Sequence, residues 1–250
     1  MYKKDGLGDR MKSNYENRSK TELFRRTPVI IRLAGKAFHT FTRGLQKPYD
    51  TILMKTMQET MLYLCENIQG CKIGYTQSDE ITLLLTDYDT LTTDAWFDYE
   101  VQKLCSVSAS MATLAFNKLF EENVVSIEDT IRYNDKFMKA MFDARCFNIP
   151  KEEVCNCFIW RQQDATRNAI QLLGQNYFSS KELHKKSCND IQDMLMVNKS
   201  INFNDERTDF KRGSCGYKDG IKWTIDREIP IFTQDRNFIE RFVYIDKESN

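Results

Sequence analysis

The sequence predicts an α+β protein built around an antiparallel sheet with a ferredoxin-like βαββαβ core. Two observations support this prediction. Strand-length apolar runs and two long amphipathic segments follow one another over residues 29–149 in the order strand, helix, strand, strand, helix, strand. The second and third strands flank the polar stretch Gln77-Ser78-Asp79-Glu80, which is typical of a tight hairpin.

Each element of this core has its own pattern. The first strand is an apolar run that stops at Ala34-Gly35, and both helices carry apolar side chains at intervals of three and four residues. The elements follow in chain order: a strand at 29–34, a helix at 49–68, strands at 72–76 and 81–85, a helix at 94–120 and a strand at 140–149.

The topology of such a core brings two distant segments together. A right-handed crossover places the third strand between the first and the second. The hairpin turn then lies beside the end of the first strand. We therefore expect Ala34 to meet Asp79 and Glu80 at one edge of the sheet.

The rest of the chain extends this core. Residues 1–27 form a polar lead-in, helical in part over 10–18, and helices are expected at 151–173 and 179–197. Short strands are expected within the glycine-containing region 210–232. We divide the chain into a catalytic core with its lead-in at 1–150 and a helical and β extension of the same unit at 151–250.

Composition limits the class of protein. The 250 residues are 41% hydrophobic and 29% charged, so the chain can form a hydrophobic core. The 36 basic and 36 acidic side chains balance, so the net charge neither favours nor excludes a nucleic-acid partner. No apolar run is long enough to span a membrane, and the N-terminus lacks the apolar block of a signal peptide. The eight cysteines show no C-x-x-C spacing, which favours buried free thiols and a reducing, cytoplasmic location over a zinc site.

The hairpin carboxylates are the first candidate site. An Asp-Glu pair in a turn is more often simply solvated, but Asp79 and Glu80 are held between two apolar strands. Two carboxylates at one sheet edge suit magnesium ions that bridge a triphosphate, and Ser78 is placed to orient a phosphate. A third carboxylate on the neighbouring strand would complete a two-metal site, and that position is Ala34.

Five motifs in order carry a family resemblance: "RLAGKAFHTF", "YTQSDEITLLL", "KLCSVSAS", "FDARCF" and "WRQQDATRNAI". Together they resemble the tRNA-His guanylyltransferase family, and most closely its bacterial and archaeal guanylyltransferase-like 3′–5′ polymerases. The resemblance implies a polymerase-palm-like core that activates a tRNA 5′ end with a nucleoside triphosphate and then adds a nucleotide. It also implies two magnesium ions, ATP and GTP as substrates, tRNA as partner, and a homotetramer.

The resemblance also assigns site residues. It makes Asp79 and Glu80 catalytic metal ligands and adds the backbone carbonyl of Gly35. The expected nucleotide-binding residues are Gly35, Lys36, Ala37, Phe38, His39, Ser78, Lys103 and Arg145, with Phe38 near the base. The expected tRNA or activation-site residues are Arg26, Asp164, Arg167, Asn168, Lys185, Lys211 and Arg212. For Lys185, in "KELHKK", a solvated helix face is the more ordinary interpretation.

The chain departs from the family at Ala34, where the family has an aspartate. Alanine offers no oxygen to a metal ion, so we expect crippled catalysis with nucleotide and tRNA binding retained. Either a working enzyme was deliberately inactivated or the chain is a natural inactive relative. The intact Asp79, Glu80, Gly35 and His39 favour the first explanation.

The second departure lies in "DATRNA". Enzymes dedicated to tRNA-His carry His-Ile-Asn-Asn where this chain has Thr166, Arg167, Asn168 and Ala169. Repair of 5′-truncated tRNA therefore fits better than tRNA-His guanylylation, although the second activity is still compatible with the sequence. So are two further classes of protein, a nucleotidyl cyclase, which shares the palm topology, and a non-catalytic tRNA-binding protein.

Overall fold

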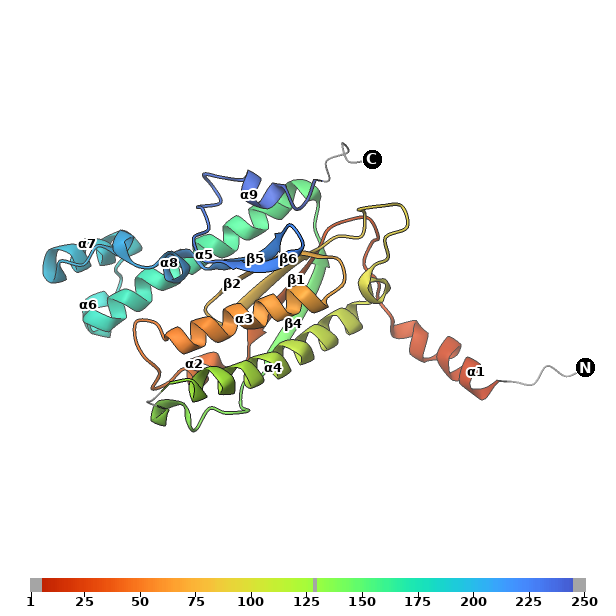
Figure 1. Cartoon of the computed structure of the whole chain (residues 1–250), viewed down its shortest axis with the longest axis horizontal. Coiled ribbons are helices and arrows are strands. Elements are labelled where there is room, and N and C mark those ends of the chain that lie inside the picture. Colours follow the sequence, from red (N-terminus) through yellow and green to blue (C-terminus); the bar gives the residue numbers. More distant parts are fainter. Residues whose placement is uncertain (1–5, 128–129, 245–250) are drawn as a thin grey trace, which may run out of the picture.

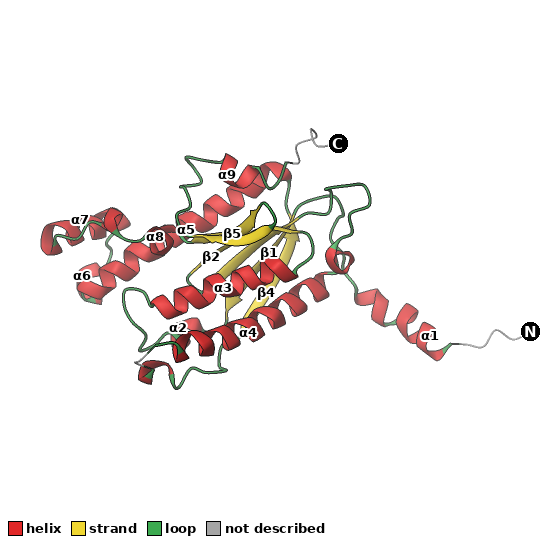
Figure 2. Ribbon diagram, in the orientation of Figure 1, coloured by secondary structure: helices red, strands yellow, loops and turns green. Residues whose placement is uncertain are grey.

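The computed structural model describes residues 6–127 and 130–244 (Figures 1 and 2). Within them, one antiparallel sheet has the strand order β4-β1-β3-β2-β5-β6. Its strands are β1 (Val29–Gly35), β2 (Cys71–Gln77), β3 (Glu80–Leu85), β4 (Phe142–Asn148), β5 (Ser214–Asp219) and β6 (Lys222–Asp226). The predicted antiparallel α+β arrangement is confirmed, and β3 lies between β1 and β2 as expected.

Helices cover both faces of the sheet (Figure 2). The helices α3 (Thr51–Asn67) and α4 (Val101–Val125) share one core with Val29, Ile31 and Leu33 of β1. The helix α5 (Lys151–Tyr177) packs with Ile30 of the same strand on the other face. Since side chains alternate along a strand, Arg32 and Ala34 fall on the α5 face with Ile30.

Two helix predictions were wrong. One helix begins later than expected, and the other is interrupted. The helix expected at 94–120 begins at Val101, because Phe97, Asp98 and Tyr99 adopt left-handed φ angles of 50°, 51° and 59°. The helix expected at 179–197 is two helices, α6 (Ser180–Leu183) and α7 (Cys188–Lys199). Each starts with a capping box, on Ser179 and on Ser187, and the second box begins a new helix.

The other elements lie close to their predicted places. In the lead-in, α1 (Leu7–Asn14) is followed by a 3₁₀ turn at Glu16–Ser19, and α5 continues to Tyr177 rather than ending at 173. The short helices are α2 (Phe38–Phe41), α8 (Thr208–Arg212) and α9 (Asn237–Glu240). The strands β5 and β6 extend the sheet beyond β2, so one sheet contains strands from both predicted parts of the chain.

Two further findings concern the predicted setting of the protein. None of the described helices combines the length and apolar character that a membrane span requires. All eight cysteines are free thiols, and five of them are buried.

Candidate functional site

The end of β1 and the β2–β3 turn lie in direct contact. The amide of Gly35 donates to the carbonyl of Asp79 at 2.9 Å, and Ala34 is paired with Glu80 across the sheet. Ser78 turns the chain with a left-handed φ of 54° and donates its hydroxyl to the Asp79 carboxylate at 3.1 Å. The expected meeting of position 34 with the hairpin carboxylates is therefore present.

Carboxylates flank Ala34 on both neighbouring strands. In register, Ala34 lies opposite Glu80 on β3 and opposite Asp143 on β4. Burial raises the pKa of Asp79, the negative charges of Glu80 and Asp143 act in the same direction, and the hydrogen bond from Ser78 opposes them. The site thus carries three carboxylates near position 34, of which Asp79 has no ion-pair partner among the described residues.

Glu80 differs from Asp79 because it already has cationic partners. It accepts from Arg32 at 3.2 Å and from Arg161 at 2.7 Å, and Arg161 also pairs with Asp164 at 2.6 Å. The Arg161 side chain is only 8% exposed. The ion pairs run from β3 through α5 to Arg167, which also binds Asp164.

A half-exposed indole lies beside these arginines. The guanidinium carbons of Arg32 and Arg161 lie 4.9 Å and 4.4 Å from the ring centroid of Trp160 on α5. Cations at this distance from an indole are attracted by its π-electrons. Trp160 therefore helps hold both arginines at the carboxylate site.

The loop after β1 is tightly folded. A side chain on Gly35 would place its Cβ 2.2 Å from the Phe38 ring, so the close approach requires glycine. Phe38 is 4% exposed and packs against Phe41, Phe116 and Phe142, so its side chain is part of the core rather than turned toward a ligand. Three residues of this loop, Lys36, Ala37 and His39, are exposed.

A cavity of about 200 Å³ opens beside Ser78. Its lining includes Lys47, Tyr49, Gln77 and Phe210, and therefore combines a cation, aromatic rings and an amide. Small-molecule sites typically combine apolar walls with a few polar groups in this way.

Two basic residues outside the loop, Lys103 and Arg145, are also predicted to bind the triphosphate, and both lie at the edge strand β4. Arg145 pairs with Asp143 at 2.7 Å, and Lys103 pairs with Glu100 at 3.6 Å. The residues around Lys103 lie beside β4, because Cys105 and the Val101 carbonyl both contact Cys146. Asp143 thus links Arg145 to the carboxylate cluster, whereas Lys103 has a partner outside it.

Lys211 and Arg212 line a second cavity, of about 310 Å³, with Gln162, Thr166 and Asn204. Lys211 donates to the Asn204 carbonyl, and burial, followed by the charge of Arg212, lowers the pKa of Lys211. Neither side chain has a carboxylate ion-pair partner within the described part of the chain. Gln162, in the lining, binds Pro230 and Phe232, whereas the adjacent Arg161 binds Glu80, so the two side chains leave α5 in different directions.

Three predicted RNA-contacting residues lie apart from these groups. Arg26 lies at the opposite end of β1, where its backbone amide binds Asp87 and its guanidinium binds the Thr90 carbonyl at 3.3 Å. Lys185 is exposed in the link between α6 and α7. Asn168 lies one helical turn beyond Asp164 on α5.

The sequence analysis missed Arg32, Asp143 and Arg161 as neighbours of the site. Arg32 had a visible signal, since a single arginine interrupts the apolar run "VIIRL". Within the described residues, no three His, Cys, Asp or Glu side chains form a group that could hold a metal ion.

Comparisons with known proteins identify the class and the family. A solved structure of a bacterial tRNA(His) guanylyltransferase-like protein in complex with ATP matches with a TM-score of 0.88 and 46% identity, over 96% of this chain and 100% of that chain. A second, in complex with GTP, matches with a TM-score of 0.79 and 42% identity over the same shares. The fold is thus that of the guanylyltransferase-like proteins, a class of nucleotidyltransferases.

The family follows from the sequence. The model of the Thg1 family, described as tRNAHis guanylyltransferase, matches residues 8–150, and the chain belongs to this family. An uncharacterized protein of Acanthamoeba polyphaga mimivirus is 30% identical over 78% of this chain and 70% of its own length. The tRNA(His) guanylyltransferase of Debaryomyces hansenii is 29% identical over 75% of this chain and 72% of its own length.

Proposed function

We propose that this chain has the architecture of an enzyme that adds nucleotides to tRNA 5′ ends in the 3′–5′ direction, with 5′-truncated tRNA as its substrate. The observation that carries the proposal is the 2.9 Å hydrogen bond from Gly35 to Asp79, which holds position 34 beside the turn carboxylates. The strand order β4-β1-β3-β2, that of a ferredoxin-like sheet, supports a palm-like core.

The nucleotide site is proposed at the loop after β1 and the cavity beside Ser78. Lys36 and His39 are exposed there, and Lys47 adds a further cation in the cavity wall. The two solved bacterial relatives hold ATP and GTP, which supports nucleoside triphosphates as ligands. The residues of this chain would bind and orient the triphosphate, which is the main protein contribution in phosphoryl transfer.

Magnesium fits the donor chemistry of the site only in part. Magnesium prefers carboxylate and carbonyl oxygens. Asp79 offers a carboxylate and Gly35 a backbone carbonyl, and one hydrogen bond joins the two residues. Ala34 offers no oxygen, and Glu80 is paired with Arg32 and Arg161. These residues fit one ion better than the two that the family resemblance implies. A bound ion would supply neutralisation of the triphosphate charge.

Ala34 therefore defines the expected defect: ATP and tRNA bind, and nucleotide addition is crippled. The test is Ala34→Asp, assayed with magnesium, ATP and a 5′-truncated tRNA, against Ala34→Asn as a control of similar size without charge. We expect Ala34→Asp to raise the rate of addition at least about a hundredfold, since a metal-binding charge stabilises a transition state by several kcal/mol. The control should change it by less than about tenfold.

Two outcomes would decide against parts of this proposal. If Ala34→Asp binds ATP but adds no nucleotide, the active-site assignment is wrong. If it binds tRNA tightly without turnover, the chain is a non-catalytic tRNA-binding protein, a function for which Ala34 is the specific supporting observation.

The tRNA site is proposed to include Arg167 on α5 and the cations of the second cavity, Lys211 and Arg212, which are free to pair with phosphates. Curated relatives named tRNA(His) guanylyltransferase support tRNA-His as the substrate instead. The run Thr166-Arg167-Asn168-Ala169, in place of His-Ile-Asn-Asn, supports repair. A side-by-side assay with intact tRNA-His and truncated tRNAs decides: a preference for adding guanosine to intact tRNA-His would refute repair.

The free thiols support a cytoplasmic location for this activity, because a reducing compartment keeps cysteines unpaired. We also propose that the chain works as the homotetramer that the family resemblance implies.

A further inference from the structure

Two cysteine side chains meet where α4 packs on the edge strand β4, and we call them the thiol pair. Cys105 Sγ on α4 lies 3.6 Å from Cys146 Sγ on β4, and both residues are half-buried. Of the other six cysteines, five are buried. The sixth, Cys188 on α7, is half-buried too, but its sulfur has no hydrogen-bond partner among the described residues. The thiol pair therefore combines two properties, a close second sulfur and partial access from solvent.

The two sulfurs of the pair have different surroundings. The Cys105 thiol donates to the Cys146 sulfur, and the Cys146 thiol in turn donates to the Val101 carbonyl at 3.9 Å. A lone pair of the Cys146 sulfur therefore faces Cys105. Burial, and then the proximity of Cys105, raises the pKa of Cys146 to about 12, so Cys146 keeps its proton at neutral pH. Since the thiolate is the reactive form of a cysteine, Cys105 is the member of the pair that reacts first.

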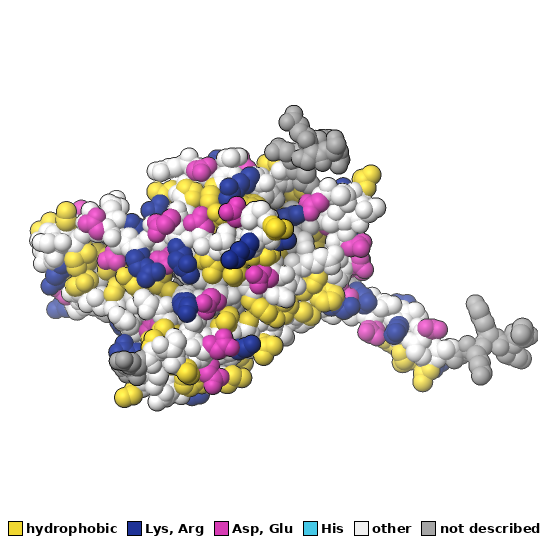
Figure 3. Space-filling view, in the orientation of Figure 1, with side chains coloured by type: hydrophobic (Ala, Val, Ile, Leu, Met, Phe, Trp, Pro, Cys, Tyr) yellow, Lys and Arg dark blue, Asp and Glu magenta, His cyan; other side chains and the backbone are white. Residues whose placement is uncertain are grey.

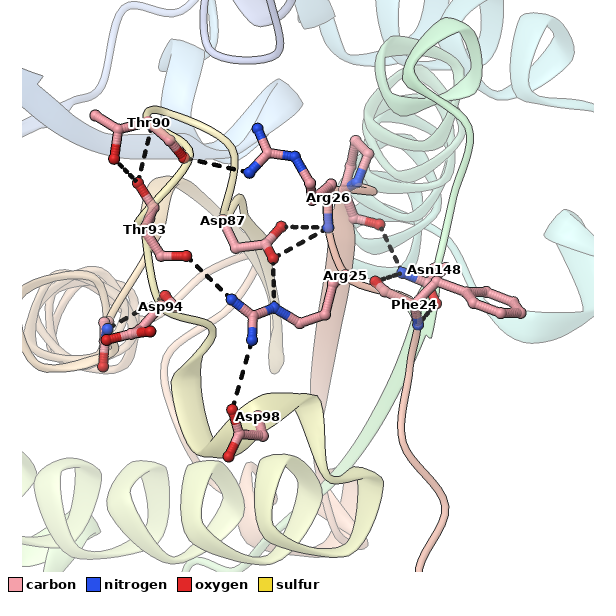
Figure 4. Close-up of polar contacts among 11 residues, drawn as sticks. Phe24, Arg25, Arg26, Asp87, Thr90, Thr93, Asp94, Asp98 and Asn148 are labelled. Carbon is pink, nitrogen blue, oxygen red and sulfur yellow. Dashed lines mark hydrogen bonds and ion pairs between the residues drawn. The ribbon is translucent and has the colours of Figure 1, made fainter.

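The segment at residues 21–26 holds α4 and β4 in this relation. The amide of Val101, near the start of α4, donates to the Thr21 carbonyl at 2.9 Å. Asn148, at the end of β4, exchanges two hydrogen bonds with Phe24, of 2.7 Å and 3.1 Å (Figure 4). Each of these contacts lies within four residues of a cysteine of the pair. The same segment thus fixes both elements, and the two sulfurs are held side by side.

We propose that the thiol pair is a site of reversible oxidation, at which hydrogen peroxide forms a disulfide that locks α4 onto the edge of the sheet. The Cys105 thiolate attacks a peroxide oxygen, the O–O bond breaks, and the departing hydroxide takes up a proton and becomes water. Cys105 is then a sulfenic acid. The Cys146 sulfur attacks the Cys105 sulfur, the S–O bond breaks, and the second hydroxide leaves with the Cys146 proton as water. The two sulfurs together lose two electrons, which the peroxide gains.

The bond requires little movement of the two elements. Bonded sulfurs are about 2.05 Å apart, so the pair closes by about 1.6 Å, a displacement within reach of side-chain rotation. The lone pair of Cys146 already faces the sulfur that it attacks. The bond would join two residues 41 positions apart and so restrict the unfolded chain as well.

A small neutral oxidant suits this surface. Apolar side chains, a class that includes cysteine in this view, gather along α4 in Figure 3. A charged oxidant such as oxidised glutathione would lose hydration against apolar groups, whereas peroxide carries no charge. In a reducing compartment other thiols restore the dithiol, so the lock is transient there.

The test follows bond formation rather than turnover, so it is independent of the proposed reaction. The full chain is treated with hydrogen peroxide in its folded state, alkylated and digested without reductant. Mass spectrometry should find the peptides of Cys105 and Cys146 joined, with two of the eight free thiols lost. Cys146→Ser should instead accumulate a sulfenic acid at Cys105, which dimedone traps. Cys188→Ser, the matched control, removes a half-buried cysteine without a sulfur partner and should react as the wild type does.

The lock itself has two physical readouts. The oxidised wild type should unfold about 5–10 °C above the reduced protein, because the bond closes a long loop. The amides of β4 should exchange with deuterium at least about tenfold more slowly, because an edge strand tied to α4 opens less often. Dithiothreitol should reverse both changes, and Cys146→Ser, which in reductant should unfold near the wild-type temperature, should show neither.

Several results would overturn the proposal. One is oxidation of Cys188 ahead of the pair, and another is a disulfide between buried cysteines such as Cys65 and Cys71. A Cys105 that proceeds to the sulfonic acid while Cys146 remains a thiol would show that Cys146 does not resolve the intermediate. A disulfide between Cys105 and Cys146 that leaves exchange of β4 unchanged would show that it locks nothing.

Discussion

Strand β3 has a carboxylate near each of its ends, and the two are built in opposite ways. Asp87, beyond the end of β3, is 0% exposed and is bound by the Arg25 side chain and the Arg26 amide. Asp79, just before β3, has Ser78 as its side-chain donor and faces the charges of Glu80 and Asp143. Asp87 is paired with a cation of its own chain, whereas Asp79 has no ion-pair partner among the described residues and lies near two other carboxylates.

The two carboxylates therefore differ in the role they can have: Asp87 stabilises the fold, and Asp79 is a candidate for binding a ligand. The Asp87 contacts fix Arg25 and Arg26 to the body of the molecule, and they leave the carboxylate inaccessible to a ligand. Asp79 is partly exposed, and its pKa is raised first by burial and then by the negative charges of Glu80 and Asp143. Of the two carboxylates, Asp79 is thus the one that a cation or a substrate can reach.

The largest expected effect is at the structural end. Asp87→Ala should lower the free energy of unfolding by about 3 kcal/mol, because the Arg26 amide loses its buried acceptor and the Arg25 guanidinium loses its closest ion-pair partner. The matched control is Asp89→Ala, since Asp89 is 40% exposed and paired with Lys72. It should cost less than about 1 kcal/mol. Urea denaturation measures both, and equal losses would show that Asp87 has no special structural role.

The next effect tests the contact between β1 and the turn. Gly35→Ala places a methyl group against the Phe38 ring and should cost about 1–3 kcal/mol through overpacking. ATP should also bind more weakly, because a displaced Phe38 moves the loop that holds Lys36 and His39. Gly8→Ala is the control, since its Cβ would meet nothing within 4 Å. Thermal unfolding and ATP titration are the measurements; unchanged ATP affinity in Gly35→Ala would separate the loop from the nucleotide site.

Much of this architecture was predictable because local rules determine it. Strand-length apolar runs define β1 and β3, and the handedness of crossovers then brings Ala34 to Glu80. The broken helix at 179–197 was predictable too, since the serine-capping pattern at Ser187 was present in the sequence.

The rest depends on contacts that no local rule encodes. Glu80 meets Arg161 only because α5 packs across the sheet, and Asp143 joins the site only through the register of β4 with β1. The left-handed run at Phe97–Tyr99 contains two aromatic residues that rarely adopt such angles, and tertiary contacts accompany it, including the pair of Asp98 with Arg25 at 3.5 Å.

The smallest effect on stability, and the most specific, is at Asp79. Because its pKa is raised in the folded state, the folded chain holds the proton more tightly than the unfolded chain. This favourable contribution is complete below the unfolded pKa and is lost as the pH rises through the folded pKa. Without magnesium, Asp79→Asn should therefore equal or exceed the wild type near neutral pH, by less than about 1 kcal/mol, and flatten this part of the pH profile.

Magnesium reverses the order of the two proteins if Asp79 is the acceptor of a cation. The ion should raise the wild-type melting temperature at neutral pH and lose this effect as Asp79 is protonated, whereas Asp79→Asn should not respond. Asp219→Asn, at the exposed β5–β6 hairpin, is the matched control and should respond as the wild type does. An equal magnesium response in all three proteins would place the ion elsewhere, and the contrast between the two ends of β3 would then concern stability alone.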